Sequence, residues 1–300
     1  MSTVGVVQLL FAALAVVMAG LGLSLDVDDF RRLLREKRAV AIAIALQVVV
    51  LPLAAFALAL ALRLPPTYAV GLMLLAAAPG SISSNLYSHV FGGNVALNMS
   101  LTGINTLLSM VTLPLTCSWS FAYFALAGET PPDVLGKLME SMVTLVVPVV
   151  VGMAVRARWP RFAERADRPM RILSVVVLVA FSAGAIVKER AALMHGFSEV
   201  GLSVVSFNLL SLALGYGLSR AIAVGRASAI AITFQLGVRS AVLSIYIAVT
   251  ALNDLQMALP AAVYSITMVL MGLSFGFLVK GRAVVGGRVP DLAYTHGSAG

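Results

Sequence analysis

Charged residues are scarce in this chain. Only 11% of its 300 residues are Asp, Glu, Lys or Arg, whereas 60% are hydrophobic. A water-soluble domain of this size could not bury so much apolar surface, so the composition excludes a soluble fold. The chain has one cysteine, Cys117, which excludes an intrachain disulfide and a cysteine metal site.

Histidines are also few, and they do not form a catalytic pattern. His89, His195 and His296 have neither metal-ligand nor triad spacing. An enzyme needs a placed acid, base, nucleophile or metal, so a membrane enzyme is disfavoured. The net charge is +8, but no basic and aromatic platform for nucleic acid accompanies it.

Apolar runs of about 20 residues recur along the chain, which is the length that an α-helix needs to cross a bilayer core about 30 Å thick. They predict an all-α membrane protein with nine transmembrane helices, at residues 4–25, 39–62, 67–90, 95–123, 135–154, 171–187, 199–219, 228–250 and 257–279. We expect residues 1–279 to form a single transmembrane domain. The Gly-rich, polar residues 280–300 are expected to form a disordered cytoplasmic tail.

The distribution of basic residues supports nine spans. With the N-terminus outside, most of the 21 Lys and Arg fall in four inner segments, at residues 31–38, 156–171, 220–226 and 280–288. A miscounted helix would invert half of these loops. We therefore expect a multi-pass protein of a bacterial-type inner membrane, with a cytoplasmic C-terminus. The first span is expected to be a retained helix rather than a signal peptide.

Two spans are interrupted near their centres. The third contains Pro79 and Gly80, followed by the polar residues Ser81, Ser83, Ser84 and Asn85. The eighth contains Gln235, Gly237, Arg239 and Ser240. Lipid offers no hydrogen-bond partner to backbone freed at such breaks. Paired interruptions in the two halves of a chain are typical of inverted-repeat transporters, although Pro79 and Gly80 could also form an ordinary kink.

Arg239 is the most unusual of these residues. A charge at the bilayer centre costs about 2.5 to 3.5 kcal/mol, so Arg239 should face a polar interior. One interpretation is a structural salt bridge. However, no carboxylate lies in the central stretch of any span. We therefore expect Arg239 to lack a fixed partner and to be free for an anionic substrate.

Motifs along most of the chain carry a family resemblance: Met18–Leu25, Asp29–Arg32, Gln47–Pro52, Leu64–Pro66, Ala78–Asn85, Gly93–Leu97, Asn105–Leu108 and Phe234–Ser240. In this order and spacing, the sequence resembles the bile acid:sodium symporter family, whose members carry bile acids and other organic anions. The resemblance implies a ten-helix inverted-repeat fold with panel and core domains and two broken crossing helices. This chain would lack the first helix, as the nine-helix members do.

The resemblance also implies a first sodium site, at Ser84, Asn85, Asn98, Thr102 and Gln235. Oxygen-bearing side chains of this kind suit a small hard cation. The chain departs from the family at two of these positions, because Asn98 stands where serine is usual and Gln235 where glutamate is usual. The glutamate normally serves both sodium sites, so this chain lacks the one formal negative charge that offsets the ions.

The second sodium site would use Gln47, backbone oxygens around Gln235, Leu236 and Val238, and residue 239. Here the family has glutamine and this chain has Arg239, followed by Ser240 in place of asparagine. A guanidinium about 6 Å from a sodium ion repels it by about 3 kcal/mol at an effective dielectric of 20. Arginine cannot lose its proton to avoid this repulsion. Our hypothesis is that Arg239 occupies the second position as a built-in cation.

These observations predict a secondary transporter of a small organic anion that works by alternating access, with altered ion sites and weakened or absent sodium dependence. The expected substrate-binding residues lie at the two breaks: Pro79, Gly80, Ser81, Ser83, Asn85, Gly237, Arg239 and Ser240. Arg239 would bind a carboxylate or sulfonate through two hydrogen bonds. We expect no cofactor, with Na⁺ as the candidate coupling ion, and the lipid bilayer but no nucleic acid as a partner.

Alternatives remain at this stage. A conventional sodium-coupled bile acid or organic anion symporter fits if Arg239 points away from the ion. A permease for metalloid oxyanions would need a thiol, but Cys117 is remote from both breaks. A membrane receptor or enzyme could use the same fold. The substrate, the direction of transport and the oligomeric state are not determined by these patterns.

Overall fold

The structure is a computed structural model that describes residues 19–20, 22–23, 36–124, 134–163, 165–166, 169 and 190–285. Over these ranges the chain is helical and contains no β-strand. Four helical stretches there are long and apolar enough to span a membrane: Lys37–Ala61, Val95–Phe124, Phe197–Ala221 and Leu259–Lys280. These findings confirm an all-α protein with membrane-spanning helices.

The described helices follow the predicted spans closely. They are α3 (Lys37–Ala45), the π-helical turn η1 (Leu46–Val50), α4 (Leu51–Ala61), α5 (Pro66–Ala77), α6 (Ser83–Val90), α7 (Val95–Phe124), α8 (Val134–Arg158), α10 (Arg190–Ala221), α11 (Arg226–Gly237), α12 (Ala241–Tyr246), the π-helical turn η2 (Ile247–Ala251) and α13 (Leu259–Val285). The predicted span at 171–187 and nearly all of that at 4–25 lie outside the described residues, so the total of nine stays a prediction.

Helix α13 extends to Val285, past the predicted end of the last span at residue 279. The physical reason is that a helix, once formed, extends beyond the apolar stretch for as long as its residues tolerate helical geometry. A disordered tail stays a prediction. The remaining tail residues, 286–300, lie outside the described ranges.

The third and eighth spans are each divided into two helices. Helix α5 begins at Pro66, since a proline at the first helical position is preset for the helix. It ends at Ala77 because Ala78 is extended, with φ −61° and ψ 145°, as the residue before Pro79 prefers. Helix α11 ends at Gly237, and the next residue, Val238, leaves helical geometry.

The two breaks lie against each other. Gly80 and Arg239 form an isolated antiparallel bridge. The Ser81 amide donates to the Val238 carbonyl at 2.8 Å, and the Ser240 amide donates to the Pro79 carbonyl at 2.9 Å. Each interruption therefore provides hydrogen-bond partners for backbone groups of the other. Such partners are needed at this depth because lipid provides none. An ordinary kink at Pro79, the alternative interpretation, is wrong.

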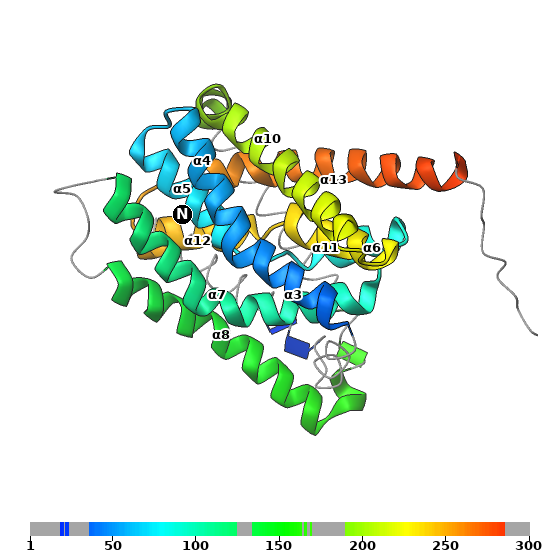
Figure 1. Cartoon of the computed structure of the whole chain (residues 1–300). Helices are drawn as coiled ribbons and strands as arrows, with labels where there is room; N and C mark the ends of the chain where they lie inside the picture. Colours follow the sequence, from blue (N-terminus) through cyan, green and yellow to red (C-terminus); the bar gives the residue numbers. More distant parts are fainter. Residues whose placement is uncertain are drawn as a thin grey trace, which may run out of the picture.

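Helix packing places this crossing inside the bundle. Figure 1 shows α12 beside α5 and α6 beside α11, and these pairs are in contact. The surrounding core contains Leu72 and Leu75 of α5 and Ile232 and Leu236 of α11, all with no exposed surface. Large apolar side chains such as Val111 face outwards from α7, which is expected where lipid is the solvent.

Candidate ion and substrate site

Arg239 lies at the centre of the crossing and has no solvent-exposed surface. Its guanidinium donates five hydrogen bonds, and every acceptor is a neutral oxygen. Nη1 donates to the carbonyls of Ala76, Ala78 and Leu75 at 2.6, 2.7 and 3.2 Å, Nε donates to the carbonyl of Leu236 at 3.0 Å, and Nη2 donates to Gln47 Oε1 at 3.0 Å. The arginine thus sits in a cage of oxygens at the ends of α5 and α11.

The expectation that Arg239 lacks a fixed partner is therefore wrong, and so is the alternative of a salt bridge for these five contacts. The breaks release the last carbonyls of α5 and α11, and these backbone groups serve as the acceptors. Each helix C-terminus carries about half a negative charge, so one guanidinium offsets two such ends. The Phe207 ring, with its centroid 5.7 Å from the guanidinium carbon, adds a cation–π contact.

Side-chain amides flank the crossing on both sides. Gln47 in η1 donates from Nε2 to the Ala78 carbonyl at 3.0 Å. In α10, Asn208 donates from Nδ2 to the Gly237 carbonyl at 3.2 Å, and the Tyr264 hydroxyl donates to the same oxygen at 2.8 Å. The sequence-based site included Gln47 but missed Asn208 and Tyr264. The sequence signal that could have indicated Asn208 was its polar side chain within the apolar span 199–219.

The remaining members of the predicted second sodium site have other roles in this arrangement. The Leu236 carbonyl accepts from Arg239, and the Val238 carbonyl accepts from the Ser81 amide. The backbone oxygen of Gln235 packs against Gly80. A Cβ added to Gly80 would lie only 2.6 Å from this oxygen. The acceptors predicted for an ion are thus engaged by protein donors or closely packed.

Four of the five residues predicted for the first sodium site converge. Gln235 Oε1 accepts from Ser84 Oγ at 3.0 Å and from Thr102 Oγ1 at 2.9 Å. Ser84 Oγ also lies 3.0 Å from Asn98 Oδ1. All four side chains have no exposed surface. The fifth residue, Asn85, has a buried Oδ1 with no hydrogen-bond partner in the described part of the chain.

This set of oxygens is chemically suited to a small hard cation. Three amide oxygens and two hydroxyls are available, and the Asn85 oxygen is an orphaned acceptor of the kind that a ligand would satisfy. All of these groups are neutral. A cation here would therefore gain ion–dipole contacts without a compensating carboxylate, which is weaker than a charged ligand set.

The predicted substrate-binding residues divide into two groups by exposure. Ser81, Ser83, Asn85 and Ser240 are partly exposed, whereas Pro79, Gly80, Gly237 and Arg239 are buried. Only the first group has exposed surface in this conformation. Gly80 has no room for a side chain, because an added Cβ would lie 2.3 Å from Gln235 Nε2.

Comparison with known proteins now identifies the family. The model of the Sodium Bile acid symporter family matches residues 11–196. The chain belongs to this family. It is similar to the uncharacterized sodium-dependent transporter YocS of Bacillus subtilis, with 30% identity over 260 residues that cover 86% of this chain and 79% of the relative.

Two further relatives carry names that refer to cargo. The chain is 27% identical over 278 residues to the probable sodium/metabolite cotransporter BASS2, chloroplastic, of Oryza sativa, covering 92% of this chain and 65% of the relative. It is 28% identical over 208 residues to the ileal sodium/bile acid cotransporter of Oryctolagus cuniculus, covering 69% of this chain and 59% of the relative. The chain thus spans just under two thirds of the plant relative's length.

Family membership confirms several predictions. The resemblance seen in the motifs is correct, and the family is one of membrane transporters rather than enzymes. Sodium is the coupling ion that the family's name states.

Proposed function

We propose that this protein is a secondary transporter of a small organic anion, working by alternating access in a bacterial-type inner membrane, in which Arg239 permanently replaces the second sodium ion. The observation that carries this proposal is the set of five hydrogen bonds from the buried guanidinium to neutral oxygens. A ring of carbonyl and amide oxygens is what a cation requires, and here the cation is part of the chain.

Electrostatics makes the replacement permanent. A sodium ion at the predicted second position would stand a few ångströms from a guanidinium that cannot deprotonate, which costs about 3 kcal/mol or more. Because Gln235 is an amide, the site has no fixed negative charge to balance a second cation. The empty carrier therefore already bears the positive charge that sodium would otherwise bring.

The first sodium position supports a second candidate function. The convergence of Ser84, Asn98, Thr102 and Gln235, with the orphaned Asn85 oxygen, favours retention of one weakly bound ion. The protein would then be a conventional sodium-coupled symporter that binds one sodium ion instead of two. The two candidates differ in one measurable property, which is the dependence of uptake on sodium.

The anion site follows from the same geometry. Helices α6 and α12 begin just after the breaks, so their positive ends and the partly exposed Ser81, Ser83, Asn85 and Ser240 are available to a carboxylate or sulfonate. Arg239 acts on this anion through its charge, while its hydrogen bonds are directed to the protein. A direct contact between Arg239 and substrate would require a different conformation.

An inverted repeat is part of this proposal. It would relate α3–α7 to α10–α13 as two halves of a core domain that moves against a panel domain. The paired contacts support it: Gln47 binds the Ala78 carbonyl as Asn208 binds the Gly237 carbonyl, and the two backbone bonds between the breaks are reciprocal. Nine spans, an external N-terminus and a single domain over residues 1–279 belong to the same proposal.

The test is uptake of small carboxylates and sulfonates into liposomes containing the purified protein, with sodium or with potassium as the only cation. We expect wild-type uptake to be unchanged without sodium and Arg239→Gln to reduce it by roughly tenfold, because the anion loses the attraction of a nearby positive charge. Arg158→Gln, at an exposed position of α8, is the matched control and should leave uptake unchanged.

A double variant tests whether Arg239 replaces the ion. Gln235→Glu with Arg239→Gln restores the carboxylate and removes the resident cation, so uptake should become sodium-dependent. A steep sodium dependence of the wild-type protein would contradict the replacement of the ion by Arg239 and favour one-ion symport.

A further inference from the structure

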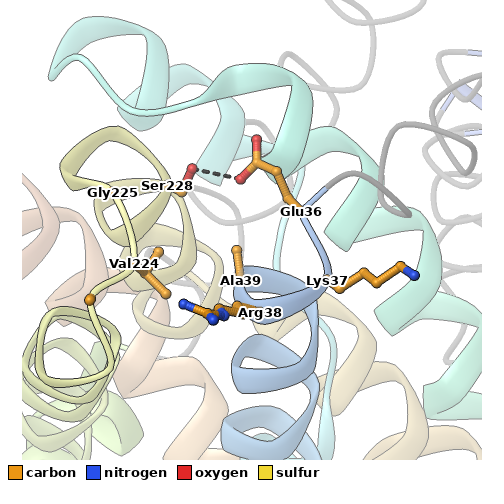
Figure 2. A pocket seen from close by; sticks show the side chains of 8 residues that line it. Glu36, Lys37, Arg38, Ala39, Val224, Gly225 and Ser228 are labelled. Atoms are coloured by element: carbon orange, nitrogen blue, oxygen red, sulfur yellow. Dashed lines mark hydrogen bonds between the residues drawn. The ribbon is translucent and has the colours of Figure 1, made fainter.

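A carboxylate ties together three helices where α3 begins. Glu36 immediately precedes α3. Its Oε1 accepts from Asn94 Nδ2 at 2.7 Å, and its Oε2 accepts from Ser228 Oγ at 2.8 Å. Figure 2 shows the bond from Ser228, in the first turn of α11, to the Glu36 side chain. One carboxylate therefore links the starting ends of α3, α7 and α11, and we call these three residues the Glu36 clamp.

Asn94 strengthens this clamp through its own backbone and side chain. Its Oδ1 accepts from the Leu97 amide at 3.0 Å, which caps the start of α7. Its backbone amide donates to the Ala227 carbonyl at 2.9 Å in the first turn of α11. The starting ends of α7 and α11 are thus joined by a side-chain path and by a backbone bond.

A similar group of residues lies at the opposite end of the span Lys37–Ala61. The hydroxyl of Tyr68, in the first turn of α5, donates to Glu199 Oε2 in α10. Tyr68 and Glu199 form the Glu199 clamp, which joins the start of α5 to α10.

The two clamps have matching parts. Each joins a glutamate of the first element of one half of the core to a hydroxyl in the first turn of a crossing helix. If the two halves form the proposed inverted repeat, the crossing helix in each clamp comes from the other half. The start of α11 is joined to the starts of α3 and α7, and the start of α5 is joined to α10.

We infer that Glu36 and Glu199 are positioning residues that hold the starting ends of the two crossing helices, each clamp acting on the helix from the opposite half. Helices α5 and α11 have 12 residues each, and neither receives a side-chain hydrogen bond at its N-cap. Helices this short are marginal alone. Arg239 binds the C-terminal ends of α5 and α11 at the breaks. The clamps hold the other ends of these two helices and so keep the oxygen cage around Arg239 aligned.

Hydrogen–deuterium exchange of the full-length protein, measured by mass spectrometry, tests whether each clamp holds the crossing helix of the opposite half. Ser228→Ala removes one hydroxyl from the Glu36 clamp and should raise exchange over residues 226–237 by roughly tenfold, while residues 66–77 are unchanged. Tyr68→Phe should instead raise exchange over residues 66–77 and leave residues 226–237 unchanged. Ser228→Thr, which keeps the hydroxyl, should restore protection, and Lys37→Gln, an exposed neighbour, should change neither helix.

The result does not depend on transport, so failure of this inference is distinguishable from failure of the proposed function. Glu36→Gln keeps one acceptor and should give a smaller increase in the same helix as Ser228→Ala. If Ser228→Ala loosens α5, loosens both crossing helices equally, or changes neither, the clamps do not position the helices in the way inferred here.

Discussion

Arg239 illustrates how a buried charge can be stable without a carboxylate partner. The energetic cost of removing a guanidinium from water is offset by five hydrogen bonds and by the negative ends of two helices. Gln47 has a dual role, because it accepts from Arg239 and donates to the Ala78 carbonyl that Arg239 also binds. The arginine is therefore a structural element of the crossing as well as a resident charge.

Arg239→Leu should destabilise the protein strongly. It leaves the Ala76 and Leu236 carbonyls and the Gln47 oxygen without this donor, and each unsatisfied group costs about 1 to 3 kcal/mol, so a loss of several kcal/mol is expected. Arg239→Lys should lose less because it keeps the charge and three donors. Thermal unfolding in detergent, followed by tryptophan fluorescence, measures the ranking. Arg158→Leu is the control, and equal stability of Arg239→Leu and wild type would refute this role.

At the scale of secondary-structure elements, two glycines allow the half-helices to approach closely. A Cβ at Gly80 would lie 2.3 Å from Gln235 Nε2 and 2.6 Å from the Gln235 backbone oxygen. A Cβ at Gly237 would lie 2.3 Å from Leu212 Cδ2, which is the end of a flexible side chain. The first contact involves backbone that cannot move without shifting α11, whereas the second can be relieved by a side chain.

The two glycine substitutions should therefore differ in whether a second substitution can reverse their effect. Gly80→Ala should lower the unfolding temperature and abolish uptake, and combining it with Gln235→Ala should not restore either property. Gly237→Ala should be milder, and Leu212→Ala should recover most of its loss by opening the needed space. Unfolding temperatures of the single and double variants provide the measurement. Full rescue of Gly80→Ala by Gln235→Ala would show that the backbone contact is unimportant.

At the scale of the whole molecule, the alternation of basic segments predicts an orientation in the membrane that the helix packing alone does not reveal. The segments at 31–38, 156–171, 220–226 and 280–288 would share one side of the membrane, and the Glu36 clamp would lie on that side. The Glu199 clamp would lie on the other. The cavity of ≈ 440 Å³ that Glu36, Arg38 and Ser228 help to line would then open towards the cytoplasm.

Reporter fusions in a bacterial host can test this orientation. A fluorescent protein fused after Val224 or at the C-terminus should fluoresce, because both positions are predicted to lie inside, and alkaline phosphatase fused after Arg63 should be active outside. Moving the phosphatase to Val224 is the matched control and should abolish its activity. A fluorescent fusion after Arg63 would mean that the predicted number or direction of the spans is wrong.

The apolar runs by themselves determined that this chain is helical and lies in a membrane, because bilayer thickness imposes a length that is visible in one dimension. Pro79, Gly80 and Gly237 likewise marked the breaks, since these residues limit backbone geometry locally. The convergence of Ser84, Asn98, Thr102 and Gln235 was anticipated only through the family resemblance, because no local pattern links residues so far apart.

Only the tertiary structure decided the partners of Arg239. Four of its five acceptors are backbone carbonyls, which every residue possesses, so no side-chain pattern could distinguish them. The same holds for Asn208, Tyr264 and the two clamps, whose members lie far apart in the sequence. Local composition determines which segments become helices and where they break, whereas packing in three dimensions determines which broken end faces which charge.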